Sequence, residues 1–246
     1  MARRGIFLAP FDELADARAL AALAERAEAA GWDGFFLWDH VDYRAPVTAL
    51  ADPWVCMAAI ACATERVLMG PLITPPARRR IHKLARETVT LDRLSGGRLI
   101  FGAGLGSDNS GEFSKFGEEA EAKARAKLLD DGLRQLVRYW AGEFQPQPVQ
   151  QPRIPIWLAA RWPNRKPVRR ALEWDGVFPI DLPGPEALAE LVAEVRAERP
   201  GDDFEIVVDN PPGTDPAPWA DAGATWCLTG FGNQPKAEEV EQAIDG

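Results

Sequence analysis

Residues 84–101 read LARETVTLDRLSGGRLIF and contain the signals of a helix, a turn and a strand in succession. The apolar side chains of residues 84–94 recur at helical spacing, whereas residues 99–101 form a short apolar run typical of a buried strand. Ser95-Gly96-Gly97 between them is a turn signal. The same alternation continues on both sides of this stretch, so it decides the expected fold.

Working outward, we expect eight strands, at residues 5–10, 34–38, 67–74, 99–101, 154–158, 176–180, 204–208 and 225–228. Expected helices cover residues 16–30, 53–63, 84–94, 118–141, 167–174, 185–199 and 236–244, while the proline-rich segment 210–222 need not be helical. Eight strand–helix units in 246 residues predict an α/β fold, a (β/α)8 TIM barrel forming one domain over residues 1–246. A doubly wound parallel sheet is the alternative.

Composition excludes several classes of function. Lys and Arg number 28 against 37 Asp and Glu, and this net charge of −9 argues against nucleic-acid binding. The longest apolar run, Trp54 to Ala63, is far shorter than the ~20 residues of a membrane span. Three cysteines without metal-binding spacing and two distant histidines predict no metal centre and favour a cytoplasmic protein.

In a (β/α)8 barrel, chemistry lies at the carboxyl ends of the strands. The second strand ends in Trp38-Asp39-His40, and imidazole is the side chain best suited to proton transfer near neutral pH. Alternation along a strand places Trp38 and His40 on one face and Asp39 on the other. His40 is therefore the leading catalytic candidate, with a loop histidine that caps a neighbour as the alternative.

Three further strand ends carry groups that suit an anion. After the third strand, Arg78-Arg79-Arg80 precede a helix and indicate an anionic partner or a solvated surface run. After the fourth, Gly104, Gly106 and Ser107 offer backbone N–H groups and a hydroxyl, or simply form a tight turn. After the fifth, Ala160-Arg161 suit a phosphate, unless Arg161 is an ordinary surface residue.

Residues 84–99, running into the glycines at 102–106, resemble the signature of the bacterial luciferase-like flavin and deazaflavin oxidoreductases. Four other segments, residues 38–40, 70–75, 152–157 and 174–179, match that family in the same order. The resemblance extends from about residue 5 to residue 230, and the Leu-Ser-Gly-Gly-Arg-Leu segment is its most specific part.

This resemblance implies a (β/α)8 barrel that binds reduced FMN or the deazaflavin coenzyme F-420 at its carboxyl-terminal face, often as a homodimer. His40 then matches the active-site histidine of deazaflavin members, beside the matching Asp39. Independently of the resemblance, Trp38 at a strand end suits a flat or apolar substrate, with core packing as the alternative. The residues matched to the coenzyme are Leu72, Ile73 and Thr74 beneath the isoalloxazine ring, Gly104, Gly106 and Ser107 near the coenzyme tail, and Ala160 and Arg161 at its phosphate. Many members have a non-proline cis peptide in the first of these segments.

Two departures from the family pattern qualify these expectations. The sugar-phosphate dehydrogenase branch has a glutamate where this chain has Ser107, which argues against that activity. Residues 143–148 pass almost directly to Pro152, so the segment before the fifth strand is shorter than usual and the pocket is expected to be more open.

The sequence thus predicts a flavin-dependent oxidoreductase, a monooxygenase using reduced FMN and oxygen on a small organic substrate, with the flavin reduced by a separate reductase. One alternative is a coenzyme F-420-dependent dehydrogenase or reductase that transfers hydride. Another is a non-catalytic flavin-binding barrel. No nucleic-acid or membrane partner is expected.

Overall fold

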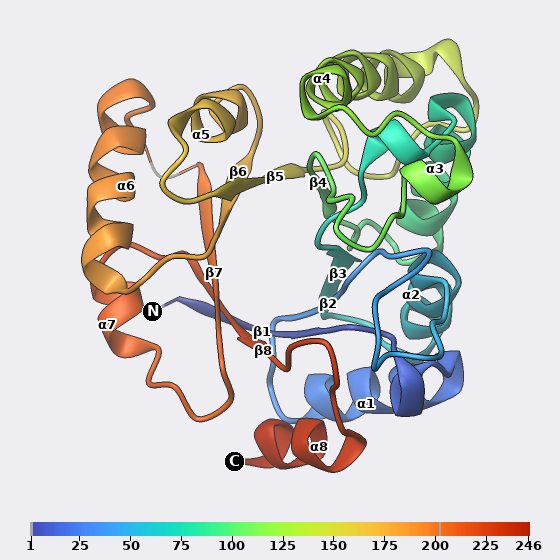
Figure 1. The fold of residues 1–246 in the computed structure, drawn as a ribbon. Helices are drawn as coiled ribbons and strands as arrows, with labels where there is room; N and C mark the ends of the chain where they lie inside the picture. Colours follow the sequence, from blue (N-terminus) through green and yellow to red (C-terminus); the bar gives the residue numbers. More distant parts are fainter. Residues whose placement is uncertain (1, 202) are drawn as a thin grey trace.

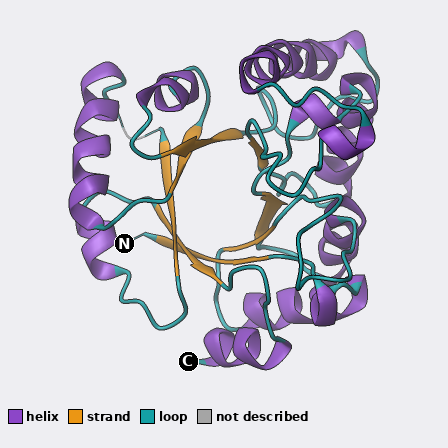
Figure 2. Ribbon diagram, in the orientation of Figure 1, coloured by secondary structure: helices purple, strands orange, loops and turns teal. Residues whose placement is uncertain are grey.

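The computed structural model describes residues 2–201 and 203–246, which form a closed ring of parallel strands surrounded by helices (Figures 1 and 2). The strands are β1 (Arg3–Leu8), β2 (Gly34–Leu37), β3 (Leu68–Pro71), β4 (Phe101–Ala103), β5 (Ile156–Arg161), β6 (Gly176–Ile180), β7 (Glu205–Asn210) and β8 (Trp226–Gly230). The helices are α1 (Ala17–Ala29), α2 (Pro53–Ala63), α3 (Ile81–Leu94), α4 (Ala122–Arg138), α5 (Arg165–Ala171), α6 (Pro185–Glu198), α7 (Ala217–Asp221) and α8 (Ala237–Asp245).

The sheet closes on itself between β3 and β4. Seven strand pairs are parallel in the order β3-β2-β1-β8-β7-β6-β5-β4. The remaining edge is joined by parallel bridges from Met69 to Leu99 and from Thr74 to Ala103. The predicted (β/α)8 barrel is therefore confirmed, and a doubly wound sheet, which has two open edges, is excluded.

Local signals explain where the first two helices begin. The Asp16 carboxylate accepts hydrogen bonds from the backbone N–H groups of Arg18 and Ala19, at 2.7 and 3.0 Å, and so caps α1. Asp52 caps α2 by accepting from Val55 N at 2.9 Å, with Pro53 in the first turn. Both starts agree with the sequence-based expectation.

The turn after α3 stabilises the neighbouring helix. Arg98 is 9% exposed, and its guanidinium donates to the carbonyl oxygens of Ala61 and Thr64 at the end of α2, both at 2.9 Å. The last carbonyls of a helix have no partner within it, so this arginine supplies the missing donors. Burial lowers the pKa of Arg98, although the group remains a cation.

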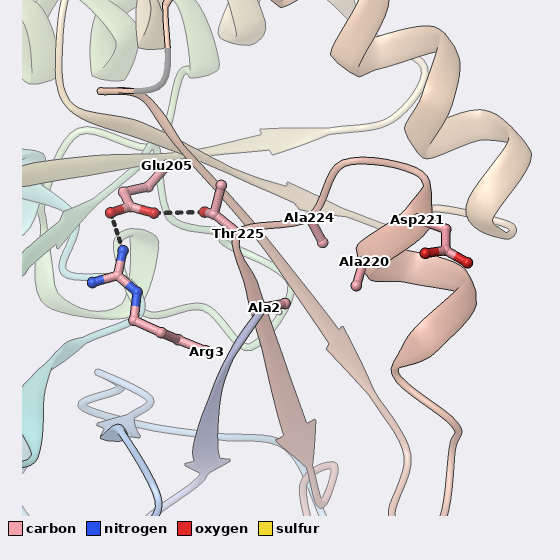
Figure 3. Close-up of a pocket in the computed structure, with 7 residues that line it drawn as sticks. All are labelled: Ala2, Arg3, Glu205, Ala220, Asp221, Ala224 and Thr225. Atoms are coloured by element: carbon pink, nitrogen blue, oxygen red, sulfur yellow. Dashed lines mark hydrogen bonds and ion pairs between the residues drawn. The ribbon is translucent and has the colours of Figure 1, made fainter.

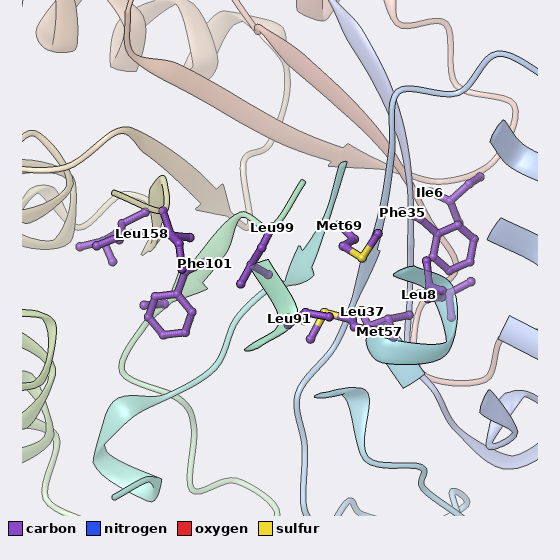
Figure 4. Close-up of a cluster of buried hydrophobic side chains, with 14 of the residues drawn as sticks. Ile6, Leu8, Phe35, Leu37, Met57, Met69, Leu91, Leu99, Phe101 and Leu158 are labelled. Atoms are coloured by element: carbon purple, nitrogen blue, oxygen red, sulfur yellow. The ribbon is translucent and has the colours of Figure 1, made fainter. Parts of the chain in front are cut away.

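Each strand divides its side chains between two apolar layers. Residues such as Ile6, Phe35 and Leu158 face the helices and form the outer core, part of which Figure 4 shows. The alternate residues fill the interior of the barrel; they are Phe7, Phe36, Leu72, Ile100, Trp157, Phe178, Val207, Trp226 and Leu228. Because large aromatic rings occupy this interior, the barrel has a packed centre, and a ligand must bind above it at one rim.

The expected boundaries differ from the observed ones at both helix and strand ends. Helix α3 begins at Ile81 rather than Leu84, and α4 begins at Ala122 rather than Glu118. β4 begins at Phe101, two residues later than expected, and β3 ends at Pro71 rather than Thr74. The long fourth helix ends at Arg138 and continues as a π-helical turn over Tyr139–Glu143. Strand ends depend on pairing with neighbours, which a single apolar run does not specify. None of the helices in the described residues is long and apolar enough to span a membrane.

Candidate active site

His40 lies just beyond the end of β2, at the carboxyl-terminal rim of the barrel. Its ring lies among aromatic rings, with centroids 4.9 Å from Tyr43, 5.7 Å from Trp38 and 5.8 Å from Phe11. His40 Nδ1 lies 2.7 Å from Glu112 Oε2, and the His40 side chain is 23% exposed. Nε2 has no hydrogen-bond partner among the described residues and is not one of their buried unpaired atoms, so it is the open side of the ring.

Glu112, the partner of His40, was not predicted from the sequence. It lies in the loop between β4 and α4, and its side chain is 2% exposed. Its Oε1 accepts from Val41 N at 2.8 Å and from Arg78 Nη1 at 2.7 Å. With 37 acidic residues in the chain, nothing in the spacing of Glu112 distinguishes it, because its partners are 34 to 72 residues away.

The loop that carries Glu112 is held by its own hydrogen bonds. The Asp108 carboxylate accepts from Phe113 N at 2.9 Å and from Ser114 N at 3.1 Å, and these backbone N–H groups lower the pKa of Asp108. Lys115 Nζ then pairs with Asp42 at 2.5 Å, which lowers the pKa of Asp42. The loop is thereby attached to the segment that follows β2.

Asp39 is fully buried and paired away from the His40 ring. Its carboxylate accepts from Arg78 at 2.8 Å and from Arg79 at 2.8 and 2.9 Å. The Thr74 hydroxyl donates to it at 2.5 Å, and Trp54 Nε1 at 3.2 Å. These contacts place Asp39 as a support of the rim, on the opposite side of the strand from Trp38 and His40 as alternation predicted.

The structure gives the arginines of residues 78–80 a different role from either expectation. Arg78 and Arg79 keep side-chain exposures of only 5% and 17% and pair with carboxylates of the protein itself. Only Arg80 is exposed. The anions that Arg78 and Arg79 bind are carboxylates of the protein itself. The sequence does not reveal this pairing, because Asp39 and Glu112 lie 34 or more residues from Arg78.

Three apolar residues at the ends of β3 to β5 form a cluster that we call the cradle: Ile73, Gly104 and Ala159. A Cβ atom on Gly104 would meet Ile73 at 2.9 Å and Ala159 at 3.2 Å. Ile73 also packs on the interior cluster of the barrel, together with Trp38. Ile73 follows Leu72 through a cis peptide bond, Leu72 is buried in the interior cluster, and Thr74 is turned to Asp39.

The glycine loop after β4 is shaped by one residue in particular. Gly106 has φ +69°, and a Cβ there would meet Phe113 at 2.8 Å and Pro75 at 2.9 Å, so a side chain is excluded both by conformation and by space. Ser107 follows, and its hydroxyl accepts weakly from Asn109 N at 3.3 Å. Both residues lie on the same rim as His40.

The predicted phosphate residues are only partly turned to the rim. Ala160 is 1% exposed, and its side chain lies in the outer core between strands and helices. Arg161 is exposed at the end of β5 but forms an ion pair with Asp181, which follows β6. The guanidinium charge is thus already matched by a carboxylate.

Asp209 is a second titratable group at this rim that the sequence did not single out. It lies two residues beyond Val207 on β7 and therefore points, like Val207, toward the barrel axis. A Cβ on Gly230 of β8 would lie 3.3 Å from Asp209 Oδ2. Desolvation, with a smaller contribution from Asp181, raises the pKa of Asp209 to about 6, although solvent still reaches the side chain.

A cavity of about 440 Å³ lies at the opposite, amino-terminal end of the barrel (Figure 3). Its lining includes Arg3, Glu205 and Thr225, at the starts of β1, β7 and β8. Glu205 pairs with Arg3 and accepts from the Thr225 hydroxyl at 2.6 Å. Because barrel chemistry lies at the other rim, we assign the candidate site to the His40 face rather than to this cavity.

Comparison with known proteins shows the family to which the chain belongs. The profile of the luciferase-like monooxygenase family matches residues 4–216. The chain belongs to this family. Its relatives use FMN or coenzyme F-420, so the luciferase-like barrel is that of a flavin- or F-420-dependent oxidoreductase family.

Two sequence relatives and one solved structure illustrate this membership. The oxygenase component of a flavin-dependent trigonelline monooxygenase of Acinetobacter baylyi is 29% identical over 143 residues, 52% of this chain and 39% of that protein. An uncharacterised protein of Mycobacterium tuberculosis is 28% identical over 248 residues, 86% of each chain. An F420-dependent secondary alcohol dehydrogenase bound to an F420–acetone adduct superposes with TM-score 0.79 at 17% identity, covering 99% of this luciferase-like chain and 96% of that structure.

Proposed function

We propose that this luciferase-like protein is a monooxygenase that uses reduced FMN and oxygen on a small organic substrate. The observation that carries the proposal is the juxtaposition, on one rim, of an apolar cradle and a histidine with an open nitrogen. Ile73, Gly104 and Ala159 form the cradle, and His40 Nε2 is the open nitrogen.

The cradle fits the flat ring of a flavin. A Cβ on Gly104 would touch both Ile73 and Ala159, so these three residues pack closely, and Ile73 also packs on the aromatic interior of the barrel. Apolar contacts of this kind favour an apolar ring system. Ile73, Gly104 and Ala159 would hold the ring there, with Leu72 supporting Ile73 from the barrel interior.

The phosphate end of the coenzyme fits the rim less closely than its ring. Arg161 and Ser107 are the polar side chains that would bind the phosphate, but Asp181 already neutralises the Arg161 guanidinium. An incoming phosphate must therefore compete with that carboxylate. The ring contacts, rather than the phosphate contacts, are expected to supply most of the coenzyme affinity.

The bound coenzyme would supply the redox chemistry, and the chain supplies proton transfer and orientation. His40 can hold or release a proton at Nε2, the ring nitrogen that faces the rim. Trp38, Phe11 and Tyr43 surround the imidazole and would exclude water from that side, while the Trp38 ring offers an apolar face to the substrate.

Hydride transfer with coenzyme F-420 is the second candidate function. A relative described as an F420-dependent glucose-6-phosphate dehydrogenase, 32% identical over 133 residues, supports it. In that reaction His40 would transfer the proton that accompanies the hydride.

For the FMN reaction, the relative described as an oxygenase component supports a separate flavin reductase as partner.

The test is an anaerobic fluorescence titration of the purified protein with reduced FMN and, separately, with reduced F-420. Micromolar or tighter binding of FMN with oxygen-dependent turnover supports the monooxygenase. Preference for F-420 with oxygen-independent turnover replaces it by hydride transfer. Absence of binding by both coenzymes contradicts the proposal.

His40→Ala, compared with His82→Ala, tests the proton-transfer role. His82 is exposed on α3 and serves as the matched control. Loss of about 10²-fold or more in turnover for His40→Ala alone, with coenzyme affinity kept, is expected for a general acid–base residue. Coenzyme binding without turnover in the wild type would instead indicate the non-catalytic binding barrel.

A further inference from the structure

The two carboxylate oxygens of Glu112 have different partners: Oε1 accepts from protein donors, and Oε2 faces His40. Its Oε1 accepts from Val41 N at 2.8 Å and from the Arg78 guanidinium at 2.7 Å. Its Oε2 lies 2.7 Å from His40 Nδ1. A carboxylate paired with a buried arginine offers only acceptor oxygens, so the hydrogen in the contact with His40 must come from the imidazole.

A neutral imidazole carries one ring hydrogen, and the partner of one nitrogen decides which nitrogen holds it. Hydrogen on Nδ1, donated to Glu112, leaves Nε2 with a lone pair. Nε2 is the nitrogen with no partner among the described residues, at the open side of the ring. Glu112 therefore determines both the orientation of the ring and the nitrogen that can accept a proton at the rim.

We propose that Glu112 is a positioning residue for His40: it fixes the Nδ1–H tautomer and presents Nε2 as the proton-accepting atom. This inference rests on the proposed function, in which His40 transfers a proton. The negative charge of Glu112 also favours the imidazolium formed when Nε2 takes up that proton, because the two charges are then in hydrogen-bond contact.

Arg78 makes this arrangement specific. It donates through Nη1 to Glu112 and through Nη2 to Asp39, so the carboxylate of Glu112 is held in one orientation. The loop contacts of Asp108 and the pair of Lys115 with Asp42 hold the backbone on both sides of Glu112. These contacts therefore keep Oε2 of Glu112 directed at His40 Nδ1.

Nitrogen-15 NMR of the histidine rings tests the tautomer without any coenzyme. At about pH 8.5 an ordinary imidazole, with pKa ~6.5, is neutral, and its protonated and bare nitrogens have well separated shifts. The chain has only two histidines, so the spectrum of His82→Gln assigns the His40 signals. We expect the His40 hydrogen on Nδ1.

Glu112→Gln is expected to reverse the tautomer. The glutamine carbonyl oxygen must stay with Val41 N and Arg78, which are both donors, so the amide NH2 group faces Nδ1. Nδ1 then becomes an acceptor, and the hydrogen moves to Nε2. Turnover should fall about 10²-fold or more, since the open nitrogen no longer has a lone pair, while coenzyme affinity stays within a factor of two.

Glu118→Gln is the matched control, because Glu118 is an exposed glutamate farther along the same loop. It should leave both the His40 tautomer and turnover unchanged. If the NMR spectrum of the wild type shows the hydrogen on Nε2, the inference is wrong. This outcome can be observed without any variant at position 112. An unchanged tautomer in folded Glu112→Gln overturns it as well.

The two experiments separate a failure of this inference from a failure of the proposed function. If the wild type has the Nδ1–H tautomer and Glu112→Gln reverses it, the link between Glu112 and His40 is supported even when neither coenzyme binds. That combination would contradict only the flavin- or F-420-dependent reaction.

Discussion

Arg78 and Asp39 are joined by two hydrogen bonds: Nη2 of Arg78 donates to the Asp39 carbonyl oxygen and to Asp39 Oδ1, each at 2.8 Å. The Arg78 side chain is 5% exposed and that of Asp39 is fully buried. The contact ties the loop after β3 to the end of β2. Since the same guanidinium also holds Glu112, it joins three strand ends into one rim.

Arg78→Ala should destabilise the protein strongly. It leaves Glu112 without its cation and removes one of the two cations of Asp39, and breaking a buried ion pair costs about 3–5 kcal/mol. Urea unfolding followed by circular dichroism measures this loss. Arg80→Ala, which truncates the exposed neighbour, should change the free energy of unfolding by about 0.5 kcal/mol or less. Equal losses in the two variants would contradict the assignment of Arg78 to the rim.

Asp209→Asn should stabilise the protein above neutral pH. The pKa of Asp209 is raised to about 6 in the folded protein, above its ordinary value of ~3.9 in the unfolded chain. Between these values the unfolded carboxyl is ionised while the folded one is protonated, so the wild type loses stability as pH rises through this range and then stays level.

The advantage of Asp209→Asn should therefore be greatest above about pH 6 and vanish near pH 4. Because solvent reaches the side chain, we expect a gain of about 1 kcal/mol at most. Urea unfolding at several pH values measures it, with Asp221→Asn as an exposed control. A gain that is constant with pH would show that Asp209 has an ordinary pKa.

Asp181→Asn should strengthen binding of a coenzyme that carries a phosphate. The substitution frees Arg161 from its ion pair, and an exposed charge interaction of this kind is worth about 0.2–1 kcal/mol. The Kd of FMN should fall about 1.4- to fivefold, while that of riboflavin, which has no phosphate, stays the same. Parallel fluorescence titrations compare the two ligands. If riboflavin gains as much as FMN, Arg161 does not contact the phosphate.

Gly104→Val should block the cradle. The first carbon of the new side chain would lie 2.9 Å from Ile73 and 3.2 Å from Ala159, so the valine must displace the residues of the cradle. We expect loss of coenzyme binding by at least about tenfold and a destabilisation of about 1–3 kcal/mol from overpacking. Titration and urea unfolding separate the two effects.

Gly184→Ala is the control for that substitution, because a Cβ at Gly184 would meet only the flexible Glu186 carboxylate at 3.1 Å. It should keep full coenzyme binding. Tight binding by folded Gly104→Val would place the coenzyme ring elsewhere on the rim.

The sequence by itself determined the alternation of strands and helices, because each depends on local patterns. The period of apolar residues, the caps Asp16 and Asp52 and the Ser95-Gly96-Gly97 turn all act within a few residues of themselves. Eight such units make a barrel of this length. His40 could be singled out in the same way, since position at a strand end follows from the strand.

The groups that meet at the rim are brought together by long-range packing and could not be read from the sequence. The charged partners of His40 and Asp39 come from the loops after β3 and β4, up to 72 residues away, and strand pairing around the barrel brings them together. The tertiary structure also turned Arg78 and Arg79 inward, paired Arg161 with Asp181 and directed Asp209 to the barrel axis. Charge and burial at such positions depend on neighbours distant in sequence, and no local pattern encodes them.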